Sequence, residues 1–392
     1  MTGRPRVLHL TTSDISLVTL LGPQLRAFAD AGYDVVTAAA PGPWTDRLHT
    51  WGIEFHPLQF STRSFTPRRD VRALAELYGL FRTLRPDIVH THNPKTGVYG
   101  RIAARAARVP VVVNTVHGLY ALPADPWAKR AVVYGMERVA ASCSDAELVQ
   151  NPEDLDVLRR LRIPATRLRL LGNGIDLDRF DPSRVPAARV AALRDELGAE
   201  PGDVVCGVVG RLVWEKGYRE IFDAAAILAD RAPNVVFVVV GPFEDVKADA
   251  ITPADLAPVA RGTRTRFLGV RDDMEHVYAA MDVFALASHR EGFPRAAMEA
   301  AAMGLPVVAS DVRGCRQVVE DGRTGRLFPV RDARALADAI ATLAADEGAR
   351  RRMGAAGREK AHREFDQQRV VDVTLETYKR LLDGRHATVP AA

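Results

Sequence analysis

The sequence predicts an α/β protein built from two successive doubly wound domains. Short apolar runs of strand length alternate with helical patterns along most of the 392 residues, and this alternation is typical of a mostly parallel sheet covered on both faces. The length exceeds what one compact core usually holds. A Gly- and Pro-containing stretch at 172–186 interrupts the alternation. We therefore place a linker there and expect a ligand cleft between the carboxyl ends of two sheets.

The first domain is expected over residues 1–180. Short apolar runs predict strands at 6–10, 33–40, 87–90, 110–116 and 146–150. Helical patterns predict helices at 19–31, 95–107 and 127–139. A further helix should begin at Asn151, which is a good N-cap residue and is followed by Pro152 and two acidic residues.

The second domain is expected over residues 181–365, and residues 366–392 form a terminal segment. Strands are predicted at 204–210, 235–241, 265–268, 282–287 and 306–310, and helices at 217–231 and 271–280. Pro253 and Pro258 should interrupt any helix within 242–262. The pattern from 332 to 384 is helical with a break near Gly354 to Gly357, and residues 386–392 should be disordered.

Residues 288–304 carry the clearest chemical signal. An apolar strand leads into a loop that holds Glu291, and Pro294 then suits the start of a helix. Free N–H groups and the positive end of a helix dipole at such a turn favour a phosphate. Glu299 lies roughly 7–8 Å further along the helix axis. The two carboxylates could therefore hold the two sugars of a nucleotide-sugar, because a carboxylate accepts hydrogen bonds from vicinal hydroxyls.

The motif Glu-Gly-Phe-Pro beginning at Glu291, the Glu-Ala at Glu299 and the following Gly-Leu-Pro-Val-Val-Ala-Ser resemble the signature of retaining family 4 glycosyltransferases of GT-B fold. The resemblance spans nearly the whole chain. It implies two Rossmann-like domains facing across a cleft, with the acceptor on residues 1–180, the donor mainly on 181–365, and a last helix that crosses back to the first domain. The donor-binding residues that it implies here are Glu291, Gly292, Phe293, Pro294, Arg295 and Glu299.

A second motif, Gly-Arg-Leu-Val-Trp-Glu-Lys-Gly, begins at Gly210, where a strand gives way to a helix. Cations are unfavourable at a helix start unless an anion binds there, so Arg211 and Lys216 could converge on a diphosphate. The family segment similar to this one contacts the donor phosphates, which implies that both residues offset charge on the leaving group. His117 ends a strand and matches a family histidine near the transferred sugar. The implied catalytic set is His117, Arg211, Lys216 and Glu291.

Two positions depart from the family pattern. The loop after the first strand has Ile15-Ser16 where members often carry a Gly pair near the donor phosphate, so Ser16 is the donor-binding candidate there. The same loop lacks the Gly-x-Gly-x-x-Gly of a dinucleotide-dependent dehydrogenase. Arg295 replaces a smaller or amide residue and could touch the donor or point to solvent.

The backbone of Phe267 and Leu268 corresponds to the segment that reads the nucleobase, although both side chains could equally belong to the core.

The segments 61–67, 90–97 and 313–316 resemble bacterial transferases that extend capsule, O-antigen or other polyprenyl-diphosphate-linked glycans. Those acceptors are anionic and membrane-borne. Residues 1–180 hold 23 Lys and Arg against 17 Asp and Glu, and the rest of the chain holds 30 against 32. The basic excess fits such an acceptor or a membrane surface, and solvated surface charge explains it equally well. The candidate acceptor-binding residues are Arg63, Arg68, Arg69, Arg72, Asn93 and Lys95.

We therefore predict a glycosyltransferase that moves a hexose or N-acetylhexosamine from a UDP-linked donor, with retention, to a hydroxyl of a glycan- or lipid-linked acceptor. The alternatives are transfer to a small natural product, a sugar-nucleotide epimerase or hydrolase of GT-B fold, and a non-catalytic sugar-nucleotide-binding protein. We expect no cofactor and no metal in the chemistry. His90 and His92 have the spacing of a metal pair, but no third ligand is evident. No basic helix with interleaved aromatic residues points to nucleic acid.

The cysteines and the apolar runs bear on location. Cys143, Cys206 and Cys315 are widely spaced and form no Cys-x-x-Cys, which fits a reducing cytosol. The N-terminal apolar run is too short for a signal peptide, and no run is long enough to span a bilayer. We expect a cytoplasmic protein, and the basic first domain is compatible with peripheral contact to the inner membrane face.

Overall fold

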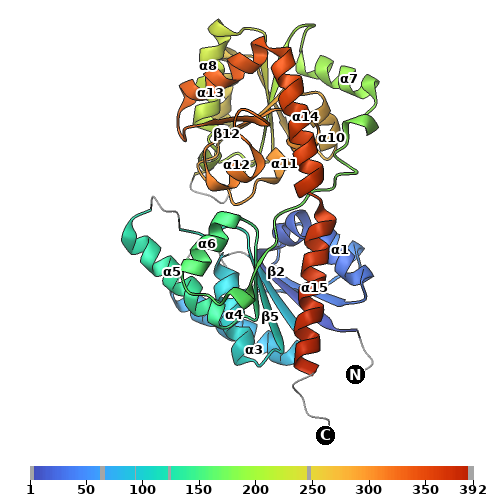
Figure 1. Ribbon diagram of the computed structural model, residues 1–392, viewed down its shortest axis with the longest axis vertical. Helices are drawn as coiled ribbons and strands as arrows, with labels where there is room; N and C mark the ends of the chain where they lie inside the picture. Colours follow the sequence, from blue (N-terminus) through green and yellow to red (C-terminus); the bar gives the residue numbers. More distant parts are fainter. Residues whose placement is uncertain (1–3, 62–66, 93, 122–124, 245–248, 387–392) are drawn as a thin grey trace. The chain divides into compact units, whose positions relative to one another are not determined.

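The computed structural model describes residues 4–61, 67–92, 94–121, 125–244 and 249–386 (Figure 1). The chain divides into two compact units. The first comprises Met1–Gly172 and Gln368–Ala392, and the second comprises Asn173–Gln367. Each unit is a parallel sheet with helices packed on it, so the predicted α/β class with two doubly wound domains is confirmed.

The first unit contains a seven-stranded sheet with the order β3-β2-β1-β4-β5-β6-β7, in which every neighbouring pair is parallel. The order reverses direction between β1 and β4, so the loops after these two strands lie where an open α/β sheet binds ligands. The strands are β1 (Arg6–Ser13), β2 (Asp34–Ala40), β3 (Glu54–Pro57), β4 (Ile88–His92), β5 (Val111–Val116), β6 (Ala146–Val149) and β7 (Leu168–Leu170).

Helices cover this sheet on both faces. They are η1 (Ser16–Leu20), α1 (Gly22–Asp30), α2 (Thr45–Thr50), α3 (Pro67–Leu84), α4 (Pro94–Ala106), α5 (Trp127–Ser142), α6 (Pro152–Arg160), the short η2 (Ala165–Arg167) and α15 (Gln367–His386). Asn151 caps α6 as predicted, because its side chain accepts a hydrogen bond from the N–H of Glu153. Helix α15 adds Val370, Val371 and Tyr378 to the buried core of this unit.

The second unit contains a six-stranded parallel sheet with the order β10-β9-β8-β11-β12-β13. Its direction reverses between β8 and β11. The strands are β8 (Val204–Val209), β9 (Val235–Val240), β10 (Thr265–Gly269), β11 (Val283–Leu286), β12 (Val307–Ser310) and β13 (Gly325–Phe328). The helices are η3 (Pro182–Arg184), α7 (Ala187–Leu197), η4 (Trp214–Lys216), α8 (Tyr218–Arg231), α9 (Pro253–Gly262), α10 (Met274–Ala279), α11 (Arg295–Ala302), α12 (Arg313–Val318), α13 (Ala333–Ala345) and α14 (Glu347–Glu364).

Two local predictions for this unit are wrong. Helix α9 forms despite Pro258, because Pro258 removes only one helical hydrogen bond and the carboxylate of Asp255 accepts from both the N–H and the hydroxyl of Thr252 at the helix start. Helix α14 continues through Gly354 instead of breaking there. A Cβ on Gly354 would lie 1.9 Å from the carbonyl oxygen of Gly304, so this glycine permits close packing and does not end the helix.

The division between the units lies at 172/173, eight residues before the predicted boundary at 180/181. The residues between the two positions belong to the second unit by their contacts. The side chain of Asn173 donates to the carbonyl of Phe293 at 3.0 Å, and Ile175 and Phe180 are buried in the core of that unit. Residues 173–180 therefore pack against the second unit although they lack a regular hydrophobic periodicity.

Candidate active site

The loop after β8 is held against the end of β11, at the reversal point of the second sheet. Gly217 has a φ of 77°, and a Cβ there would lie 2.0 Å from the carbonyl oxygen of Ala287. The backbone N–H of His289 donates to the carbonyl of Glu215 at 2.9 Å. Only glycine allows this approach at position 217. The two motifs predicted to bind the donor are therefore adjacent.

Lys216 and Glu291 form an ion pair at this point. The Nζ of Lys216 lies 2.6 Å from Oε1 of Glu291, and the two side chains are 25% and 11% exposed. The residues are 75 positions apart in the sequence. A largely buried ammonium and carboxylate at the carboxyl edge of a parallel sheet can bind a phosphate and the hydroxyls of a sugar at the same time.

The backbone of Glu291 passes directly over the start of α12. A Cβ on Gly314 would lie 2.7 Å from both the carbonyl carbon and the carbonyl oxygen of Glu291, and 2.8 Å from the oxygen of Gly292. Gly314 thus helps to set where Glu291 stands. From the sequence, Gly314 is only one residue of the segment 313–316. Its position beside the donor loop follows from this close backbone contact.

Among the described residues, Arg211 forms no ion pair with Glu291. Its Nη1 lies 2.5 Å from Oε2 of Glu244 instead. The loop that carries Arg211 is fixed at its start, because the hydroxyl of Tyr218 donates to the carbonyl of Gly210 at 2.8 Å. Each cation of the predicted diphosphate site thus pairs with a carboxylate.

Glu299 lies on α11 and accepts a hydrogen bond from the hydroxyl of Tyr278 at 3.0 Å. Burial raises the pKa of Glu299, while the charge of Arg295, this hydrogen bond and the charge of Arg179 act in the opposite direction. The sequence analysis did not predict a role for Tyr278, because no local pattern links an isolated aromatic residue to Glu299, 21 positions further along the chain.

The remaining donor candidates lie at the start of α11 and on β10. Pro294 is the N-cap residue of α11 and so stands one position before the first helical residue. The ring of Phe293 packs edge-on against Phe365, with centroids 5.8 Å apart. Phe267 and Leu268 lie on the edge strand β10, half-buried against the two cores that flank the sheet.

In the first unit, His117 stands immediately after β5 and belongs to a group of four histidines. Its Nε2 lies 3.1 Å from Nδ1 of His92, whose Nε2 lies 3.1 Å from Nδ1 of His9. His90 stacks on His92. Burial lowers the pKa of His9 to about 3 and that of His117 to about 4, and the nearby Gln150 side chain opposes the shift of His117. Burial also lowers the pKa of His90 and His92 well below the usual value, so all four imidazoles are neutral at pH 7.

His9 supplies the third histidine beside His90 and His92, which the sequence analysis did not identify. His9, His90 and His92 offer nitrogen atoms within 4.8 Å of one another, close enough to consider a metal ion. However, both nitrogens of His90 already have neighbours, the hydroxyl of Tyr378 at 2.5 Å and that of Thr115 at 2.7 Å. The ring planes of His90 and His92 are also stacked at 30°, so their in-plane lone pairs do not converge. The arrangement fits a hydrogen-bonded cluster better than a metal site.

The predicted acceptor residues are only partly assembled. Arg68 and Arg69 are exposed on the first turn of α3. Lys95 is buried, and its Nζ lies 2.6 Å from Oδ1 of Asp70. Arg63 and Asn93 lie outside the described residues. Ser16 begins η1, with its hydroxyl 3.5 Å from that of Ser13.

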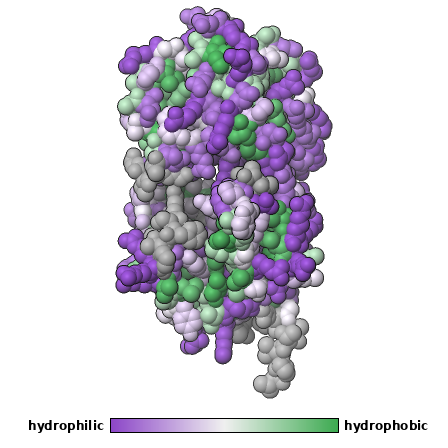
Figure 2. Space-filling view, turned by 90° about the vertical axis from the view of Figure 1, so that its left-hand side faces the viewer, coloured by the Kyte–Doolittle hydropathy of each residue, from purple (hydrophilic) through white to green (hydrophobic). Residues whose placement is uncertain are grey.

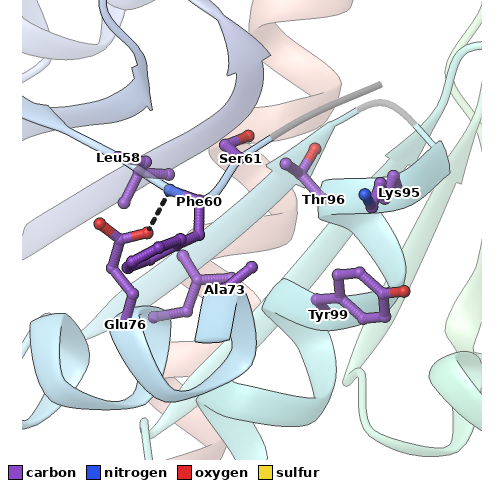
Figure 3. Close-up of a pocket in the computed structure, with 9 residues that line it drawn as sticks. Leu58, Phe60, Ser61, Ala73, Glu76, Lys95, Thr96 and Tyr99 are labelled. Carbon is purple, nitrogen blue, oxygen red and sulfur yellow. Dashed lines mark hydrogen bonds between the residues drawn. The ribbon is translucent and has the colours of Figure 1, made fainter. Parts of the chain in front are cut away.

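A pocket lies beside Lys95 in the first unit (Figure 3). The carboxylate of Glu76 accepts from the N–H groups of Gln59 and Phe60 at 2.8 and 3.1 Å and so fixes one wall. The guanidinium of Arg72 lies over the ring of Phe60. The lining residues are Leu58, Phe60, Ser61, Ala73, Glu76, Leu77, Lys95, Thr96 and Tyr99.

Comparison with known proteins gives two family matches. Residues 190–360 match the model described as glycosyl transferases group 1, and residues 19–174 match the glycosyl transferase 4-like domain. The chain is 31% identical over 312 residues to the UDP-Gal:alpha-D-GlcNAc-diphosphoundecaprenol alpha-1,3-galactosyltransferase of Escherichia coli, covering 78% of each chain. It is 24% identical over 382 residues to the N,N'-diacetylbacillosaminyl-diphospho-undecaprenol alpha-1,3-N-acetylgalactosaminyltransferase of Campylobacter jejuni, covering 96% of this chain and 99% of that one.

Solved structures agree on the fold. The crystal structure of Anabaena Alr3699/HepE in complex with UDP and glucose superposes with a TM-score of 0.80 at 21% identity, over 96% of this chain and 100% of that one. Sucrose-phosphate synthase from Thermosynechococcus elongatus gives 0.80 at 24% identity, over 97% and 100%.

Proposed function

This chain belongs to the group 1 glycosyltransferases and has the GT-B fold, and we propose that it transfers a sugar from a UDP-linked hexose or N-acetylhexosamine. In this proposal the configuration at the anomeric carbon is retained, and the acceptor is a hydroxyl of a glycan- or lipid-linked intermediate. The reaction uses no cofactor and no metal ion. The named relatives that use UDP-linked or undecaprenyl-diphosphate-linked substrates support this choice.

The observation that carries the proposal is the pair of Lys216 and Glu291 at the reversal point of the second sheet. The 2.6 Å contact brings one ammonium and one carboxylate together, and this pair of charges suits a diphosphate and its sugar. When the donor binds, Lys216 exchanges the carboxylate for the diphosphate. Glu291 is then released to hold sugar hydroxyls and to stabilise positive charge at the anomeric carbon.

The other residues act around this pair. Arg211 joins Lys216 on the diphosphate after leaving Glu244, and Arg295 contacts the phosphate or sugar at the start of α11. Glu299, which the hydroxyl of Tyr278 orients, accepts hydrogen bonds from the ribose hydroxyls. Gly210 and Gly292 let the backbone approach the donor closely. The remaining donor contacts are assigned to Ser16, Phe267, Leu268, Phe293 and Pro294.

No side chain in this set is assigned as a nucleophile, so we propose that the acceptor itself attacks the anomeric carbon. The acceptor oxygen bonds to the anomeric carbon on the face from which the diphosphate departs, and the acceptor proton passes to the departing diphosphate oxygen. His117 is assigned a contact with the transferred sugar. Acceptor binding is assigned to Arg63, Arg68, Arg69, Asn93 and Lys95, and Lys95 must leave Asp70 to contribute.

A donor test separates this proposal from its alternatives. The protein is incubated with UDP-, GDP- and dTDP-sugars and its thermal unfolding is measured. A ligand at about 100 times its Kd adds about 2.7 kcal/mol to stability, which is easily detected. We expect stabilisation by one UDP-sugar, and release of UDP that depends on a lipid-linked or glycan acceptor. UDP release without acceptor would indicate a hydrolase, acceptor-free isomerisation an epimerase, and transfer to a small aglycone a natural-product enzyme.

The role of Glu291 is tested separately. Glu291→Gln keeps the shape of the side chain but removes its charge, so transfer should be lost while UDP still binds. Glu359→Gln on α14 is the matched control, since its carboxylate is 69% exposed. Transfer at the wild-type rate by Glu291→Gln would remove this residue from the mechanism.

Contact with an anionic membrane surface is proposed through α5. Its outward face carries Trp127, Val132 and Val139, which are 80%, 61% and 58% exposed. The only acid of the helix, Glu137, is turned inward to Arg101, while Lys129 and Arg138 are exposed. An aromatic and aliphatic face with basic flanks suits the headgroup region of a bilayer.

Figure 2 looks onto the side of Figure 1 on which α5 lies, and hydrophobic residues form patches there between hydrophilic ones. Among the described helices, none has the length and apolarity needed to cross a membrane. The test is flotation with vesicles: Trp127→Ser should weaken binding to anionic vesicles, Trp44→Ser should not, and equal binding by both variants would contradict the assignment.

A further inference from the structure

The donor loop, residues 287–294 between β11 and α11, contacts the start of α8 at a second place besides the Lys216–Glu291 pair. Nε2 of His289 lies 2.9 Å from Oε1 of Glu220. The two residues are 69 positions apart in the sequence, and both belong to the second unit. Two side-chain contacts therefore join the loop to the segment that begins α8.

Glu220 is buried although it carries a carboxyl group. It is 7% exposed and lies in the first turn of α8. Its Oε2 is buried and makes no hydrogen bond within the described residues. A buried carboxylate that lacks hydrogen bonds destabilises the fold, and its place near a helix start offsets only part of this cost. The imidazole of His289 is the side-chain partner described for it.

His289 anchors the donor loop through its backbone as well as its side chain. Its backbone N–H donates to the carbonyl of Glu215 at 2.9 Å. Because a carboxylate only accepts hydrogen bonds, the proton of the side-chain contact lies on Nε2 of the imidazole. The residue before it is also fixed, since the hydroxyl of Ser310 donates to the carbonyl of Ser288. The backbone of the loop is therefore held two positions before Glu291.

The Lys216–Glu291 contact cannot hold the loop throughout transfer. In the proposed function the diphosphate takes Lys216, and Glu291 turns to the sugar. That exchange removes one of the two side-chain contacts between the loop and α8. Neither Glu220 nor His289 has an assigned contact with the donor, so their hydrogen bond can persist when the donor is bound.

We propose that Glu220 and His289 are positioning residues that keep the donor loop in place once Lys216 has left Glu291. In the free protein either contact suffices to hold the loop. In the donor complex the Glu220–His289 contact remains, and it fixes the backbone from which Glu291 reaches the sugar. This inference rests on the proposed function, because there the diphosphate is what separates Lys216 from Glu291.

The first test breaks the two contacts separately and needs no substrate. Lys216→Ala removes one contact, and Glu220→Met removes the other with a side chain of similar length that favours a helix. Amide hydrogen exchange is measured over the peptide that covers residues 287–293. We expect each single variant to exchange within about 2-fold of the wild type, and the double variant about 10- to 100-fold faster, the value of one charge-assisted hydrogen bond.

Two results of this experiment would overturn the proposal. One is equal exchange in all four proteins, because the Glu220–His289 contact would then hold nothing. The other is exchange in Glu220→Met as fast as in the double variant, because the Lys216–Glu291 contact would then contribute nothing in the free protein.

Variants of His289 separate the contact from a general effect of an acid on α8. In His289→Gln the amide nitrogen falls near the place of Nε2 and can still donate to Glu220, whereas in His289→Asn it falls near Nδ1 and cannot. In the Lys216→Ala background, His289→Asn should loosen the loop as Glu220→Met does, and His289→Gln should restore protection. Unchanged exchange in His289→Asn would show that Glu220 acts only on the helix, and the proposal would fail.

The chain offers a matched control and a second lesion. Nε2 of His56 lies 2.8 Å from Oε1 of Glu54 in the first unit, so His56→Asn breaks a similar contact away from the donor loop and should leave exchange over 287–293 unchanged. If Glu220→Met does not fold, His289→Asn provides the lesion in its place.

Kinetics connect the contact to transfer. With UDP bound, Glu220→Met alone should loosen residues 287–293, since the diphosphate then occupies Lys216. We expect the acceptor-dependent transfer rate per UDP-binding site to fall by about 10-fold, with the Kd for UDP within about 2-fold of the wild type. Fewer UDP-binding sites with an unchanged rate per site would indicate a purely structural role and overturn the proposal. If the wild type did not bind UDP, the proposed function would have failed instead, and the ligand-free exchange would still decide whether the two contacts hold the loop together.

Discussion

Replacing Gly314 by Ala should impair transfer through the position of Glu291 alone. Gly314 lies in the short helix α12 and has no positive φ. In a helix, Ala is by itself more stable than Gly by about 0.5–1 kcal/mol. The substitution therefore carries no backbone penalty, and its only obstacle is the backbone of the donor loop.

The size of the effect follows from the contact distances. The new Cβ would stand 2.7 Å from the carbonyl of Glu291, about 0.7 Å closer than the 3.4 Å at which ordinary contact begins. The obstructing atoms are backbone atoms and not the end of a flexible side chain. A misplacement of 1 Å in a catalytic geometry costs about 100-fold, so we expect a loss of roughly 10- to 30-fold in transfer rate.

The assay is acceptor-dependent UDP release, with UDP binding measured by calorimetry. UDP affinity should stay within about 2-fold, because the displaced group holds the sugar and not the nucleotide. Gly79→Ala in α3 is the control, since a Cβ there meets nothing within 4 Å. Wild-type transfer by Gly314→Ala, or an equal loss in Gly79→Ala, would refute the reasoning.

Three further predictions concern single side chains. Lys216→Ala should raise the Kd for UDP by about 10- to 100-fold, the value of one charge-assisted hydrogen bond; calorimetry checks this, and an unchanged Kd would place the diphosphate elsewhere. Tyr278→Phe removes a hydrogen bond that opposes the raised pKa of Glu299. A carboxyl with a raised folded-state pKa loses stability as pH rises through that pKa, so urea unfolding should show greater destabilisation by this variant at pH 7 than at pH 4. His9 has a folded-state pKa of about 3, below its unfolded value, so its contribution to stability is lost as pH falls below about 6.5. His9→Phe should therefore reduce the drop in unfolding free energy between pH 6.5 and 5 by about 2 kcal/mol, and an unchanged drop would show that His9 does not titrate on unfolding.

Short-range sequence patterns predicted the local structure around the candidate site. The strand, loop and helix around Glu291 and Glu299 were readable, because Pro294 and the residues after it set the backbone over a few positions. The same local reasoning failed at Pro258 and Gly354. At Pro258 the capping contacts of Thr252 outweighed one lost hydrogen bond, and at Gly354 a distant carbonyl explained the glycine.

The sequence by itself determined the alternation of strands and helices, the two-domain organisation and the loops that carry the donor motifs, since these depend on propensity and periodicity along neighbouring residues. Only the tertiary structure decided that Lys216 meets Glu291, that Gly314 lies under the same loop, and that three histidines form one chain. Those contacts join residues that are 23 to 83 positions apart. Strand order brings them together, and no local pattern encodes which loops a parallel sheet will place side by side.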